Sequence, residues 1–160
     1  MKATFLGGGR EVGRVGILSE IENEKILIDY GITPENPPLY PIESPPVSNA
    51  IVSHAHLDHS GMIPWLCNRY NAKVFTTPLT REISEILYRD TIKIADSTGY
   101  PFPYSENEID FAMQKFVNIE EGTEMKLNDL EIRFHHAGHI PGSVMIEINN
   151  ILFACDINTI

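Results

Sequence analysis

All six histidines of this 160-residue chain fall in two short segments, and the first of them, residues 54–59, reads H-x-H-x-D-H. Alternate side chains of an extended strand share one face, so His54 and His56 can reach the same metal ion. Asp58 and His59 follow where the chain turns into a helix, and they can bind a second ion nearby. Imidazole and carboxylate together suit Zn²⁺, and Mn²⁺ or iron also fits this donor set. This segment therefore predicts a metal site.

The second histidine segment covers residues 135–139 and reads HHAGH. His139 follows a glycine, which permits a close approach of the backbone, and we interpret it as a third metal ligand. His135 and His136 stand at the end of an alternating, strand-like run. We interpret these two as strand-end packing or as support for the ligands.

Two isolated aspartates each end an apolar run, residues 26–28 before Asp29 and residues 151–155 before Asp156. A carboxylate at the position of Asp156 can bridge two metal ions. Asp29 can accept an N–H from a ligating histidine and so fix its tautomer. An aspartate at a strand end is also a common turn residue, which is the alternative interpretation of both. Cys155 is interpreted as a core residue rather than a ligand.

The elements that must position these residues alternate between strands and helices. Strands are expected at residues 2–6, 15–21, 25–29, 50–53, 73–76, 117–119, 124–127, 130–136, 144–148 and 151–155. Helices are expected at residues 62–70, 80–96 and 105–116. Residues 32–48 hold six of the eleven prolines and predict a long surface loop. This order predicts an α/β fold with helices on the outer faces of sheets.

Two of the expected helices carry more specific signals. The apolar face of helix 80–96 is expected to turn inward with Ile83, Ile86, Leu87 and Ile94. Ser105 and Glu108 have the spacing of a capping box, so we expect the third helix to begin there.

Composition limits the function classes. The chain has 22 acidic and 12 basic residues and a formal net charge of −10, which argues against coating nucleic acid through bulk electrostatics. A bound cation dominates its local field, so a metal site that handles phosphate stays compatible with this charge. Two cysteines are too few for a disulfide scaffold. Without an apolar run of membrane-spanning length or a signal peptide, we expect a cytoplasmic protein with no membrane partner.

Further motifs stand around the histidine segments: LGGGREVG at residues 6–13, IDYG at 28–31 and HAGHIPGS at 136–143. Together with H-x-H-x-D-H, they resemble the β-CASP nucleases of the metallo-β-lactamase superfamily. FACDIN at residues 153–158 resembles the next motif of this family, in which a glycine usually stands where this chain has a cysteine. The resemblance covers essentially the whole chain. It implies the α/β metallo-β-lactamase fold, an αββα sandwich.

The resemblance also implies a site for two Zn²⁺ ions. Its implied ligands are His54, His56 and His139 for one ion, Asp58 and His59 for the other, and Asp156 as the bridge. Asp58, His59 and the supporting Asp29 are the residues expected to act in catalysis. The implied reaction is zinc-dependent hydrolysis of phosphodiesters in RNA processing, by endonuclease or 5′ exonuclease action. RNA is the expected substrate and DNA the alternative.

Members of the family are longer than this chain, with a β-CASP domain inserted before the final strands. Residues 1–160 are therefore expected to form the N-terminal segment of a metallo-β-lactamase domain, to bind metal incompletely on their own and not to cleave RNA. A homodimer formed through segments outside this chain is a further expectation. One alternative function is another hydrolase of the superfamily, acting on thioesters or lactones. The other is a catalytically inactive metal-binding module used in assembly.

Overall fold

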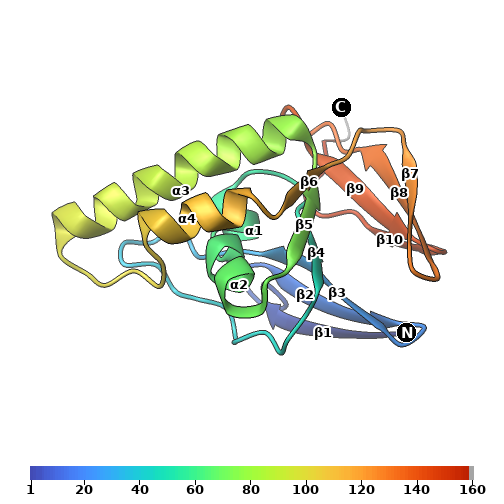
Figure 1. Ribbon diagram of the computed structural model, residues 1–160, viewed down its shortest axis with the longest axis horizontal. Coiled ribbons are helices and arrows are strands. Elements are labelled where there is room, and N and C mark those ends of the chain that lie inside the picture. Colours follow the sequence, from blue (N-terminus) through green and yellow to red (C-terminus); the bar gives the residue numbers. More distant parts are fainter. Residues whose placement is uncertain (159–160) are drawn as a thin grey trace.

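The computed structural model describes residues 1–158 as two β-sheets packed face to face, with helices against one outer face (Figure 1). The first sheet runs in the order β1 (Lys2–Gly7), β2 (Gly16–Ile21), β3 (Glu24–Tyr30), β4 (Asn49–Ile51), β5 (Lys73–Thr76) and β6 (Phe116–Asn118). The second runs in the order β10 (Ile151–Phe153), β9 (Val144–Ile148), β8 (Leu130–His136) and β7 (Glu124–Leu127). The helices are α1 (Leu57–Ser60), α2 (Ile63–Tyr70), α3 (Pro78–Thr98) and α4 (Glu106–Met113).

Strand direction decides where the loops meet. Strands β3 to β6 are parallel to one another, so the segments that follow β3, β4 and β5 leave the first sheet at one edge. In the second sheet β8 and β10 are both antiparallel to β9 and therefore also end on the same side. The segments that follow β4, β8 and β10 carry the candidate ligands, and Asp29 lies near the end of β3.

Side-chain alternation along the central strands builds two cores. In β3, Leu27 faces the helices, where it packs among buried residues of α2, α3 and α4. Its neighbours Ile26 and Ile28 face the second sheet, where they meet Ile132 and Ile146. All five of these side chains are buried, as expected for a strand covered on both faces. The result is three layers, helices on a sheet on a second sheet, which agrees with the α/β class and with three of the four layers of the expected αββα sandwich. Within residues 1–158, no helix covers the outer face of the second sheet.

Most of the elements expected from the sequence are confirmed, with shifts of a few residues at their ends. Residues 32–48 form no helix or strand, as the prolines indicate. The N–H of Ser105 donates to the Glu108 carboxylate at 2.8 Å, which confirms the capping box. A short helix, α1, already begins at Leu57, ahead of the expected start at residue 62.

The expected orientation of α3 is wrong. Ile86 and Ile94 are 68% and 42% exposed, and Ile83 and Leu87 are only partly covered. The buried face carries instead Thr80, Ser84, Tyr88, Thr91, Ile92 and Ala95. This face packs against α1, α4 and β6, and the Thr80 hydroxyl donates to the Gly142 carbonyl in the loop that carries His139. Hydrophobic periodicity alone therefore selected a neighbouring face of this helix.

Candidate metal centre

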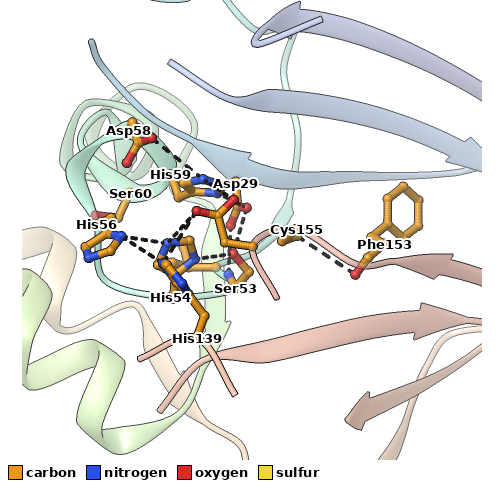
Figure 2. Close-up of polar contacts among 12 residues, drawn as sticks. Asp29, Ser53, His54, His56, Asp58, His59, Ser60, His139, Phe153 and Cys155 are labelled. Atoms are coloured by element: carbon orange, nitrogen blue, oxygen red, sulfur yellow. Dashed lines mark hydrogen bonds and ion pairs between the residues drawn. The ribbon is translucent and has the colours of Figure 1, made fainter. Parts of the chain in front are cut away.

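Three histidine rings gather at the edge where the loops of the two sheets meet (Figure 2). His54 and His56 follow β4 in an extended segment, and His139 comes from the loop between β8 and β9. His54 Nε2 lies 3.1 Å from His56 Nδ1, and His139 Nε2 lies 3.3 Å from the same His56 atom. Asp156, which follows β10, brings Oδ2 to 3.4 Å from His139 Nε2 and 4.0 Å from His54 Nε2.

This donor set fits a zinc ion. Tetrahedral coordination with bonds of 2.0–2.1 Å places ligand atoms about 3.3 Å apart. The ligand atoms of His54, His56, His139 and Asp156 all lie within 4.8 Å of one another. The spacing is therefore close to what such an ion needs, with only small adjustments of the side chains.

A second group of donors lies beside the first. His59 Nε2 is 3.5 Å from Oδ1 of Asp156 and 3.8 Å from Oδ2 of Asp58. Asp156 therefore faces the three rings with one carboxylate oxygen and faces His59 with the other. A carboxylate in this position suits two neighbouring ions, and the structure brings together all six residues that the sequence selected as ligands.

The backbone of Asp58 is held by an unusually close contact. Its carbonyl oxygen accepts the N–H of Val15 at 2.7 Å, and the N–H of Ile32 donates to the Leu57 carbonyl at 2.9 Å. A Cβ added to Gly31 would lie 1.8 Å from the Asp58 carbonyl oxygen. Only glycine allows β3 to run this close to α1. The IDYG motif thus sets the position of the helix that carries Asp58 and His59.

Asp29 stands at an irregularity of β3. Gly16 pairs with Tyr30 and Ile17 pairs with Ile28, so Asp29 is an extra residue in the ladder and has a φ of +56°. Such a bulge redirects a side chain. The buried carboxylate faces His59, with Oδ2 2.7 Å from Nδ1, and it also accepts the Ser53 N–H at 2.7 Å.

Asp29 and His59 each stabilise the charged form of the other. Burial opposes ionisation of Asp29, but the His59 ring and the hydrogen bond from Ser53 outweigh it, so the pKa of Asp29 is lowered. Burial also opposes protonation of His59, but Asp29, Asp58 and Asp156 together raise its pKa. Asp29 therefore keeps a proton on His59 Nδ1 and leaves Nε2 directed at the other candidate ligands.

The pKa of His54 is shifted in the opposite direction to that of His59. Burial lowers its pKa to about 4, with the nearby His59 ring acting in the same direction, so the ring is neutral at pH 7. Its Nδ1 lies 3.0 Å from Ser53 Oγ, and that hydroxyl donates to Asp29 Oδ2 at 2.8 Å. Because the Ser53 hydroxyl donates its hydrogen to Asp29, Ser53 Oγ can act only as the acceptor of a hydrogen bond from His54 Nδ1–H. The lone pair of Nε2 then faces the site. Sequence reasoning missed Ser53, whose one signal is its place directly before H-x-H.

His135 and His136 lie away from this cluster. His135 Nε2 is 2.7 Å from the Glu147 carboxylate, and His136 Nδ1 is 2.9 Å from that of Glu121 on the surface. Cys155 is half-buried beside the second core, and burial raises the pKa of its thiol. It has a φ of +53°, which L-residues rarely adopt and which suits the glycine usual at this position in the family it resembles.

Four histidines and three aspartates at the edge of an α/β/β sandwich define a candidate binuclear metal centre. A family model described as the metallo-beta-lactamase superfamily matches residues 10–159. The chain belongs to this superfamily, which confirms the expected fold class and the resemblance.

Archaeal proteins are among the relatives that the chain matches. It is 38% identical over 163 residues to RNase aCSPSF2 of Saccharolobus solfataricus, covering 96% of this chain and 32% of the relative. It is 31% identical to transcription termination factor FttA of Pyrococcus abyssi, covering 93% of this chain and 26% of the relative. It is 33% identical to Probable RNase MJ4 of Methanocaldococcus jannaschii, covering 93% of this chain and 36% of the relative. The chain thus spans between about a quarter and a little over a third of these relatives.

Solved structures share the fold at low sequence identity. An archaeal metallo-beta-lactamase superfamily protein from Sulfolobus tokodaii superimposes with a TM-score of 0.56 at 17% identity, covering 88% of this chain and 56% of that one. The subclass B3 metallo-beta-lactamase BJP-1 of Bradyrhizobium japonicum gives 0.58 at 16% identity, covering 94% and 56%. Among the described residues, no helix is long and apolar enough to cross a bilayer.

Proposed function

We propose that this chain supplies the metal centre of a zinc-dependent phosphodiester hydrolase that acts on RNA in the cytoplasm. The observation that carries the proposal is the convergence of His54, His56, His139 and Asp156, whose ligand atoms lie within 4.8 Å of one another. The relatives named as ribonucleases or as a transcription termination factor support RNA as the substrate class.

Each residue has a defined part in this proposal. His54, His56 and His139 would hold one zinc ion, Asp58 and His59 would hold a second, and Asp156 would be shared by both. When bound, such ions neutralise charge on a phosphate group and acidify an attacking water. Asp29 accepts a hydrogen bond from His59 Nδ1–H, and Ser53 Oγ accepts one from His54 Nδ1–H, so both rings present Nε2 to the site.

The test uses the native protein, isolated from its source cells with an antibody raised against this chain. Zinc content is measured, and labelled RNA, matched single-stranded DNA, a thioester and a lactone are offered as substrates. We expect bound zinc and cleavage of RNA that a chelator abolishes and that zinc restores. Cleavage of DNA, the thioester or the lactone in preference to RNA would replace the proposed substrate, and zinc binding without any hydrolysis would indicate an assembly module.

A matched pair of variants links the activity to the site. His139→Ala removes a proposed ligand, whereas His136→Ala removes a histidine three residues earlier that is 69% exposed and lies outside the cluster. We expect RNA cleavage to fall at least a hundredfold in His139→Ala and to stay within twofold of wild type in His136→Ala. Equal activity of the two variants would contradict the proposal.

A further inference from the structure

The loop that carries His139 is tied to neighbouring segments at its two ends, where the Val144 N–H donates to the Ser53 carbonyl at 2.9 Å and the Asn158 N–H donates to the Ala137 carbonyl at 3.0 Å. It spans residues 137–143 between β8 and β9. Within the loop, the N–H of Ser143 donates to the Ile140 carbonyl at 3.0 Å, and the N–H of Ile140 donates to Ser143 Oγ at 3.2 Å. These two bonds shape the middle of the loop, and they do not connect it to another segment of the protein.

The start of α3 connects the middle of the loop to the protein body. The carbonyl oxygen of Gly142 accepts a hydrogen bond from Thr77 Oγ1 at 2.8 Å and another from Thr80 Oγ1 at 3.0 Å. The two hydroxyl oxygens also lie 3.0 Å from each other, so the three oxygen atoms form one compact group. Both threonines are buried, at 6% and 0% exposure.

The contact between the loop and the helix is tight. Gly142 has a φ of +86°, and a Cβ built on it would lie 2.9 Å from Thr77 Oγ1 and 3.1 Å from the backbone nitrogen of Thr80. Thr77 is also the N-cap of α3, because its Oγ1 accepts the N–H of Thr80 at 3.3 Å. A rigid helix end therefore holds the loop three residues beyond His139.

We propose that Thr77 and Thr80 are positioning residues for His139. They fix the Gly142 carbonyl against the start of α3 and so hold the His139 ring at the distance from His56 that a shared ion requires. This inference rests on the proposed metal centre. It also gives a role to the buried hydroxyl group of Thr80 at the start of α3.

The experiment compares four variants of the full chain. Thr80→Val removes one donor and leaves the N-cap residue in place, and Thr77→Val/Thr80→Val removes both donors. Thr77→Ser/Thr80→Ser keeps both hydroxyls and is the rescue variant. Thr91→Val is the matched control, since Thr91 is also buried on α3 but its hydroxyl donates to Leu87 within the helix.

Two readouts are taken, neither of which needs enzymatic activity. The dissociation constant for Zn²⁺ is measured by competition with a chelating dye, and the visible absorption of bound Co²⁺ reports how many ligands surround the ion. Changes in the surroundings of metal ligands typically weaken metal affinity about 10- to 100-fold. We expect Thr80→Val to weaken zinc binding about tenfold, the double valine variant to weaken it further, and both to change the cobalt spectrum.

The rescue and control variants should keep the zinc affinity and cobalt spectrum of the wild type. Wild-type values in folded Thr80→Val protein would overturn the proposal, as would an equal loss in Thr80→Val and Thr91→Val, which would mean only a structural role. If the double variant does not fold, the zinc affinity and cobalt spectrum of Thr80→Val alone decide between these outcomes. Failure of the wild-type chain to bind Zn²⁺ or Co²⁺ at all would instead reject the metal centre itself.

Discussion

The carboxylate of Asp29 lies 2.7 Å from Nδ1 of His59, and both side chains are buried between the first sheet and α1. Folding lowers the pKa of Asp29, so its contribution to stability is present above its ordinary value of 3.8 and is lost as the pH falls through the lowered value. Folding raises the pKa of His59, so its contribution is present below 6.5 and is lost as the pH rises through the raised value. Both contributions to stability are therefore fully present between pH 3.8 and pH 6.5.

Asp29→Asn should therefore destabilise the metal-free protein most at mildly acidic pH. Breaking a buried ion pair by removing one partner costs about 3 kcal/mol. We expect a loss of this size at pH 5.5 and a smaller loss at an alkaline pH above the raised pKa of His59, as measured by urea unfolding. Asp96→Asn, at an exposed position of α3, is the control and should change stability little at either pH. An equal cost at both pH values would show that the pairing of charges is unimportant.

Asp58→Ala should weaken binding of one proposed ion and leave the other in place, because Asp58 is a proposed ligand of the second ion only. The Asp58 carboxylate is partly exposed, and the backbone carbonyl that fixes α1 is kept in the variant, so the fold should persist. We expect the second ion to be lost or greatly weakened and the turnover of the native protein to fall by several orders of magnitude. Zinc per chain is measured by mass spectrometry, with Asp129→Ala as a surface control. Full zinc content and wild-type turnover in a folded Asp58→Ala protein would contradict the two-ion proposal.

Gly31→Ala should disturb the site through the backbone. The added methyl group would collide with the Asp58 carbonyl, which is backbone and has no free direction in which to move. We expect a loss of stability of about 3 kcal/mol or more, together with weakened metal binding. Gly99→Ala is the control, because Gly99 also ends an element but a Cβ there meets no atom within 4 Å. Its positive φ of +78° should cost only about 1 kcal/mol. Thermal unfolding of the two variants compares these costs.

The ligand set could be selected from the sequence because most of its spacing is local. His54, His56, Asp58 and His59 lie within six positions, and the alternation of an extended strand followed by a helix is enough to direct them to one place. The strands could also be predicted from the sequence, since the alternation of apolar and polar residues along them is clear. Ser53 was missed because a serine next to a histidine has no distinctive spacing, and its role appears only when Asp29 approaches from another strand.

The orientation of α3 could not be predicted for a different physical reason. Hydrophobic periodicity assumes that the buried surroundings of a helix are apolar. The start of α3 instead packs against the backbone carbonyl of Gly142, which needs hydroxyl donors, so Thr80 is buried and Ile86 is left outside. The close contact of Gly31 with Asp58 was likewise invisible, because it depends on how β3 meets a helix formed much later in the chain.

The most direct test of the metal centre is an anomalous diffraction map of zinc-loaded crystals of the native protein, recorded on both sides of the zinc absorption edge. We expect two peaks roughly 3.5–4 Å apart, the usual separation in two-metal sites. One peak should lie among His54, His56 and His139 and the other beside Asp58 and His59, with Asp156 between them. A map without zinc peaks at these residues, or with peaks only elsewhere on the protein, would contradict the proposed centre.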